Sequence, residues 1–178
     1  ALDSIDFHPE PFESHLFCDY IYLSLSCEER KAISSIKMDY VVTLLQYKEF
    51  TLDLDTMNPI RLNLNFEHPV KELIFTVQLE EYAVCDFGLN GDDLFETVKL
   101  NLNGLPRTGK MEPEYMRLIQ NLKYHTNIPS SNIYTYSFAV NPEDWKPSGS
   151  TNFSRTLESS LHFKFSENQK KNGKLKVK

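Results

Sequence analysis

Hydrophobic and polar residues alternate along much of this chain, and the alternation predicts short β-strands. The clearest case is 60–66, where Ile60, Leu62, Leu64 and Phe66 alternate with polar residues. A period of two is typical of a strand with one buried face. Pro59 and the His68-Pro69 dipeptide bound this segment, since proline cannot donate to a sheet ladder.

Further strands are predicted where apolar, aromatic and β-branched residues cluster between turn residues. These segments are 16–25, 38–46, 50–54, 70–79, 96–102, 132–140 and 157–165. The centre of 70–79 is apolar on both faces, which indicates a strand covered on each side. The strand at 96–102 ends at Asn103-Gly104, a strong turn dipeptide.

Two helical excursions interrupt the strands. Ser26 is a candidate N-cap for a short helical turn, and Glu28 and Glu29 suit its first turn. The second helix is predicted over 114–123, with Pro113 at its start and four apolar residues at helical spacing: Tyr115, Leu118, Ile119 and Leu122.

About eight strands with few, short helices leave no room for parallel βαβ units. The pattern predicts an all-β fold, an antiparallel β-sandwich of the jelly-roll type. The chain has 178 residues, enough for one domain with a real core, so 1–178 is expected to form a single jelly-roll domain. No apolar stretch approaches the ~20 residues of a membrane span.

Charge is unevenly distributed along the chain, whose formal net charge is −6. Residues 164–178 carry six Lys and one Glu, whereas the first 163 residues carry 13 basic and 24 acidic residues. An acidic body disfavours direct nucleic-acid binding, because affinity for phosphate comes mostly from Lys and Arg. Residues 166–178 are predicted to form a basic hairpin or tail.

Cysteine usage and the first residues indicate a reducing compartment. Three cysteines, Cys18, Cys27 and Cys85, form no C-x-x-C pair and make an odd number, which argues against a disulfide framework or a zinc site. Each is interpreted as a small buried apolar side chain. Residues 1–6 lack the pattern of a signal peptide, so secretion is not expected.

Enzyme chemistry finds no support in the motifs. The five histidines lack metal-ligand spacing, no nucleophile elbow or phosphate-cradling loop occurs, and the acidic pairs Glu80-Glu81 and Asp92-Asp93 are weak candidates for acid/base work or calcium binding. We therefore expect no catalytic residues, no metal and no cofactor. Asn152-Phe153-Ser154 matches the N-glycosylation pattern, so Asn152 is a candidate acceptor.

A β-scaffold with Tyr- and Asn-rich loops is common among lectins and capsid proteins alike. The residues alone are compatible with both classes of protein, lectins and capsid proteins. A carbohydrate-binding module remains an alternative, and a cupin-like enzyme is a weaker one.

Two segments extend the interpretation. Residues 63–78 read NLNFEHPVKELIFTVQ, and residues 134–155 read YTYSFAVNPEDWKPSGSTNFSR. Both resemble signature blocks of the major capsid proteins of nucleocytoplasmic large DNA viruses, the iridovirus, phycodnavirus and mimivirus-like group. DYIYL at 19–23, EER at 28–30 and YHTNIP at 124–129 are similar to further family segments and occur in family order.

The resemblance implies the second of two tandem jelly rolls in a capsid subunit. Such subunits form homotrimers of pseudo-hexagonal outline that tile an icosahedral virion shell, in contact with neighbouring capsomers and minor capsid proteins, above an internal membrane. Assembly in the host cytoplasm is expected. A single jelly-roll minor capsid or penton protein is the alternative within this class.

The matching positions fall in turns and loops. They are His68, Pro69, Lys71, Glu72, Pro142, Pro147, Ser148, Gly149, Asn152, Phe153, Ser154 and Arg155. Lys71 and Glu72 are expected to pair or to reach a neighbour, the prolines and glycine to stiffen a loop, and Phe153 to anchor inward. Each residue is interpreted either as part of a corner of the sandwich or as a subunit contact.

Overall fold

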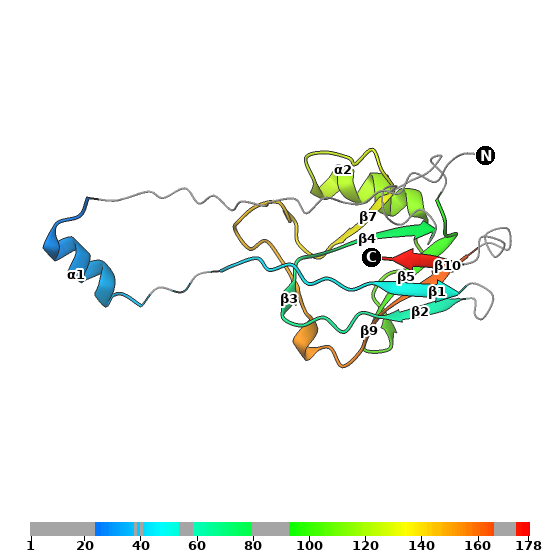
Figure 1. Cartoon of the computed structure of the whole chain (residues 1–178), viewed down its shortest axis with the longest axis horizontal. Helices are drawn as coiled ribbons and strands as arrows, with labels where there is room; N and C mark the ends of the chain where they lie inside the picture. The colour runs from blue at the N-terminus through cyan, green and yellow to red at the C-terminus, as the bar shows by residue number, and fades with distance from the viewer. Residues whose placement is uncertain (1–23, 38, 40, 54–58, 80–92, 166–173) are drawn as a thin grey trace, which may run out of the picture. The chain divides into compact units, whose positions relative to one another are not determined.

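The computed structural model describes residues 24–37, 39, 41–53, 59–79, 93–165 and 174–178, and the chain divides into two compact units, Ala1–Thr43 and Leu44–Lys178 (Figure 1). The first unit contains helix α1 (Cys27–Ser35). Ser26 Oγ accepts from the N–H of Glu29, and the Glu29 carboxylate accepts from the N–H of Ser26. This capping box confirms the predicted N-cap, and its hydrogen bonds lower the pKa of Glu29.

The second unit contains two four-stranded antiparallel sheets (Figure 1). The first has the order β1 (Phe50–Asp53), β10 (Lys174–Val177), β4 (Glu72–Leu79), β7 (Ile133–Ser137). The second has the order β2 (Ile60–Asn63), β9 (Ser159–Lys164), β5 (Thr97–Leu102), β6 (Leu105–Pro106). The shorter elements of the second unit are the strand pair β3 (Pro69–Val70) and β8 (Thr151–Asn152), the π-helix η3 (Tyr115–Ile119), α2 (Gln120–Tyr124) and the 3₁₀-helix η4 (Phe153–Arg155). The predicted all-β antiparallel architecture is confirmed.

An aromatic cluster joins the two sheets in the core. Phe75 of β4 lies 5.4 Å from Tyr134 of β7, centroid to centroid, and meets Phe163 of β9 edge-on at 5.6 Å. Phe95 packs edge-on against both Tyr134 and Phe163. Stacked and edge-on aromatic pairs both add to the free energy of simple burial, so this cluster anchors the sandwich.

The period-two prediction is confirmed along β2, where Ile60, Leu62 and Leu64 are buried and Arg61 and Asn63 are exposed. The predicted turn is also found. Asn103 has φ 52° and Gly104 has φ 75°, the left-handed pair that a two-residue hairpin between β5 and β6 requires.

The strand predicted over 38–46 is wrong for the residues that the structure describes. Residues 39 and 41–46 have no regular secondary structure, and Val41, Val42, Leu44 and Leu45 are 70–92% exposed. A strand needs a backbone partner, and none pairs with this segment in the described part of the chain. Gln46 uses its side-chain amide instead, bonding both the N–H and the C=O of Glu67.

Burial departs from the sequence pattern at several other positions. Ile74 in β4 is 57% exposed, so this strand is not covered on both sides along its length. The apolar stripe that predicts the second helix is exposed, whereas Met116, Gln120 and Asn121 are buried. Cys27 is exposed and free rather than buried. Cys18, Cys85 and the predicted strand at 16–25, apart from the irregular Ser24 and Leu25, lie outside the described residues.

Candidate functional site

The two signature segments fold into one corner of the second unit. β3 pairs antiparallel with β8, with Pro69 opposite Asn152 and Val70 opposite Thr151. This two-stranded pair ties the segment 63–78 to the segment 134–155, which are separated by more than fifty residues. We call the residues 67–72 and 138–156 the signature corner.

The backbone of His68 is held from both sides in this corner. Its N–H donates to Ser154 Oγ at 2.7 Å, and its C=O accepts from the N–H of Phe153 at 3.0 Å. His68 has φ 65°, a left-handed conformation in which histidine is enriched among non-glycine residues. Pro69, the next residue, has no backbone N–H to donate. The two hydrogen bonds of His68 therefore hold this turn in its place.

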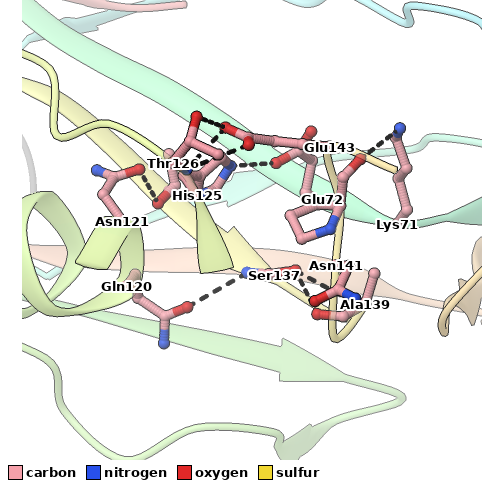
Figure 2. A network of polar contacts seen from close by, with 12 residues as sticks. Lys71, Glu72, Gln120, Asn121, His125, Thr126, Ser137, Ala139, Asn141 and Glu143 are labelled. Carbon is pink, nitrogen blue, oxygen red and sulfur yellow. Dashed lines mark hydrogen bonds and ion pairs between the residues drawn. The ribbon is translucent and has the colours of Figure 1, made fainter. Parts of the chain in front are cut away.

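Lys71 links the end of β3 to the second segment. Its C=O accepts from the N–H groups of Phe138 and Ala139, and its ammonium donates to the C=O of Pro142 at 2.7 Å (Figure 2). Pro142 is fully buried. Lys71 therefore contacts a backbone carbonyl of its own chain rather than Glu72, and this contact holds the base of the loop that follows β7.

That loop is closed by Ser148 and Gly149. Ser148 Oγ accepts from the N–H of Asn141 at 2.8 Å and donates to its C=O at 3.0 Å. Gly149 has φ 145°, and a Cβ there would lie 2.9 Å from the C=O oxygen of Phe138. Only glycine fits this close approach. The loop itself presents Pro147 and Trp145 to solvent.

The last signature residues differ in burial. Phe153 is 2% exposed and packs edge-on against Phe138 at 5.8 Å, which matches the predicted inward anchor. Asn152 is half-buried in β8, and its Oδ1 is buried with no hydrogen-bond partner in the described part of the molecule. Arg155 is exposed at the end of η4. Glycosylation of Asn152 stays a prediction.

Two acidic residues connect the corner to the segment after α2 (Figure 2). Glu72 Oε2 lies 2.9 Å from His125 Nε2. The carboxylate of Glu143 accepts from the N–H and the hydroxyl of Thr126. Sequence reasoning did not identify these partners of Glu72 and Glu143, although the resemblance at 124–129 marks the segment that supplies them.

A buried polar network fastens α2, which continues directly from η3, to β7 (Figure 2). Asn121 Oδ1 accepts from Thr135 Oγ1 at 3.1 Å, and its amide donates to the C=O of Arg117. Gln120 Oε1 accepts from the N–H of Ser137. Because buried polar groups must be satisfied, these contacts select the polar side of the helix as the inner one.

Asp93 forms a second, partly buried polar cluster. Its carboxylate accepts from the hydroxyl of Tyr134 at 2.6 Å and lies 3.3 Å from Arg117 Nη2. Burial, together with the hydrogen bond to Asp93, raises the pKa of Tyr134 well above its ordinary value. Of the acidic pairs weighed from the sequence, only Asp93 lies among the described residues, and its contacts there are structural.

The described ranges contain no group of three or more His, Cys, Asp or Glu residues placed to hold a metal ion. Within the same ranges, no helix has the length and apolar character needed to cross a bilayer.

Comparison of the fold with solved structures identifies its class, the viral jelly-roll capsid fold. The Faustovirus major capsid protein superposes with a TM-score of 0.58 at 11% identity, covering 72% of this chain and 31% of that one. The crystal structure of PBCV-1 VP54 superposes with a TM-score of 0.57 at 18% identity, covering 86% of this chain and 50% of that one. The predicted jelly roll is confirmed.

The family follows from sequence comparison. Residues 29–176 match the family model described as large eukaryotic DNA virus major capsid protein, and the chain belongs to this family. The major capsid protein of Pyramimonas orientalis virus is 31% identical over 170 residues, and that of Chrysochromulina ericina virus is 42% identical over 71 residues. The first match covers 83% of this chain and 40% of the relative, and the second 40% and 12%. The chain therefore spans less than half the length of these relatives.

Proposed function

We propose that this chain is part of a structural subunit of a virion shell and acts by self-assembly. The observation that carries the proposal is the signature corner, in which both family segments are tied together by backbone clamps in a chain of the major capsid family. Such a corner stabilises a rigid loop arrangement that subunits can pack against. In this proposal the side chains serve packing and positioning, without catalysis.

Exposed apolar side chains support an assembly role. On η3, on α2 and in the segment after α2 they are Tyr115, Leu118, Ile119, Leu122 and Ile128. On the loop after β7 they are Val140 and Trp145. Monomeric proteins rarely expose large contiguous apolar patches, and aromatic residues are enriched in interfaces. These side chains favour burial between subunits.

The finer parts of the proposal follow the family resemblance. The unit is the second jelly roll of a tandem pair; the subunits form homotrimers of pseudo-hexagonal outline; and these tile an icosahedral shell with minor capsid proteins, above an internal membrane. Assembly takes place in the host cytoplasm. A stable trimer interface of this kind buries on the order of 2,000 Å² or more.

Sedimentation of the full-length subunit tests the proposal. We expect a trimer at micromolar concentration under assembly-permitting conditions. Immunogold labelling of purified virions should place the protein in the shell. A monomer in solution, together with absence from the virion, would contradict the proposal.

A further inference from the structure

Basic side chains form a row across the outer face of the sheet β2-β9-β5-β6. Arg61 of β2 lies opposite His162 of β9, and His162 lies opposite Lys99 of β5. The neighbours of these residues along each strand, such as Leu62, Leu161 and Leu100, are buried. The basic residues therefore share the face that points away from the core.

The row extends beyond β5. Val98 and Met111 exchange both backbone hydrogen bonds at 2.9 Å, so Lys110, which precedes Met111, comes beside Lys99. Lys110 is exposed. Lys164 of β9 lies on the same face, two residues from His162. We call Arg61, Lys99, Lys110, His162 and Lys164 the basic face.

His162, which separates Arg61 from Lys99, is counted as neutral at pH 7, so the positive charges of the basic face are those of Arg61 and the three lysines, and these repel one another. Only part of this repulsion is offset within the described chain, where Glu158 pairs with Arg61 and Glu96 pairs with Lys164. Burial and the charges of Arg61 and Lys99 lower the pKa of His162, while Glu158 acts in the opposite direction. For Lys99 and Lys110 the described residues provide no ion pair. Among the described residues, the face thus retains positive charge without a paired carboxylate at Lys99 and Lys110, in a chain of net charge −6.

We infer that the basic face is a docking surface for acidic side chains of a second copy of this chain. The inference rests on the proposed function, because it names one contact surface for that assembly. Charge complementarity selects the occupant: the first 163 residues carry 24 acidic against 13 basic residues. Glu112 and Glu114 are exposed and have no ion pair among the described residues. They are examples of carboxylates on a second copy that could bind the basic face.

The symmetry of a ring accommodates such a contact. In a cyclic trimer each interface is heterologous, so a basic surface on one copy meets a different, acidic surface on the next. A nucleic acid is a poorer occupant, because the net negative charge of the chain opposes the approach of phosphates. Electrostatic complementarity of this kind sets register and association rate as well as affinity.

Zero-length carbodiimide cross-linking of the full-length subunit identifies the occupant directly, because it joins a lysine to a carboxylate in contact with it. An equimolar mixture of ¹⁴N- and ¹⁵N-labelled protein separates cross-links between copies from those within one copy. We expect mixed-isotope cross-links from Lys99 or Lys110 to Asp or Glu. The Lys164–Glu96 pair, 2.8 Å apart, is the internal positive control. An intact assembly without mixed-isotope cross-links from these lysines overturns the inference.

Charge reversal supplies the quantitative test. The double variant Lys99→Glu/Lys110→Glu is expected to raise the dissociation constant of assembly about tenfold at low salt, with the effect shrinking as salt screens the contact. The double variant Lys31→Glu/Lys37→Glu, at two exposed lysines in and just after α1, reverses the same number of charges and is the matched control, and Lys99→Arg should retain assembly. If the wild type does not assemble, the proposed function fails.

If the wild type assembles and the Lys99→Glu/Lys110→Glu variant equals the Lys31→Glu/Lys37→Glu control, only the docking inference fails. A DNA oligonucleotide that binds the wild type and not the double variant, with assembly unchanged, would identify nucleic acid as the occupant and overturn it as well.

Discussion

The N–H of His68 donates to the hydroxyl of Ser154 across 86 positions of sequence. This bond is one of several that hold the signature corner together, and its removal is expected to loosen the corner. We expect Ser154→Ala to lower the free energy of unfolding by about 1 kcal/mol, because the donor loses its protein acceptor. Urea denaturation of the full-length protein measures the change. Ser150→Ala, at an exposed serine of the preceding loop, is the control, and equal values for the two variants would contradict this role.

Gly149 combines a positive φ with a close approach to the backbone of Phe138. Gly149→Ala is expected to cost about 2–4 kcal/mol, because both strain and overlap with a rigid backbone oxygen act on the new methyl group. Two other glycines separate these causes. Gly104 has φ 75° with open space around it, and Gly109 has open space without a positive φ. Gly104→Ala should cost about 1 kcal/mol and Gly109→Ala close to nothing, whereas a common value for all three would refute the steric argument.

The hydroxyl of Tyr134 is expected to make stability sensitive to alkaline pH. Its pKa is raised in the folded protein above the ordinary value of 10.0. The folded state therefore keeps a proton that the unfolded state releases, so stability is fully present below about pH 10 and falls as pH rises further. Tyr134→Phe removes this dependence and costs about 1–3 kcal/mol at neutral pH, since the partly buried carboxylate of Asp93 loses a donor.

Unfolding free energies at pH 8 and pH 10.5 provide the measurement for Tyr134. The wild type should lose more stability between these values than Tyr134→Phe does. Tyr124→Phe, in which no buried carboxylate loses a donor, serves as the control. Parallel pH profiles for the wild type and Tyr134→Phe would show that the hydroxyl is not the source.

The inner side of the helix can be tested by two truncations. Met116 is 1% exposed and Leu122 is 68% exposed. Met116→Ala is expected to destabilise by about 2–4 kcal/mol through the cavity it leaves, while Leu122→Ala should stay within about 0.5 kcal/mol. Thermal and urea unfolding of both variants at a concentration below assembly separate folding from association. A larger loss for Leu122→Ala would reverse the assignment of the inner side.

Local sequence pattern predicted the elements whose burial is one-sided. The alternation around Ile60 and Leu62 identified β2, and Asn103-Gly104 identified the hairpin, because both signals depend on neighbouring residues alone. The segment around Val41 and Leu45 has the same β-propensity and is not a strand. Whether a strand forms there depends on a partner distant in sequence, which no local pattern encodes.

The inner side of the helix was hidden for a different reason. The spacing of Leu118 and Leu122 predicts a helix, but it does not say which side of that helix packs against the sheet. The inner contacts of Gln120 and Asn121 depend on hydroxyl and backbone groups that β7 provides. Likewise, the family resemblance marked His68 and Ser154 as notable, but their contact follows from the pairing of β3 with β8, which only the three-dimensional structure reveals.

The position of β10 has a consequence for how the protein folds during synthesis. This strand is the last of the described strands in sequence, yet it lies between β1 and β4 in its sheet. Until Lys174–Val177 has left the ribosome, β1 and β4 both expose unpaired edges that can join other nascent chains. Completion of the sheet therefore waits for Lys174–Val177, and polypeptides interrupted before Lys174 are expected to be prone to aggregation and dependent on chaperones.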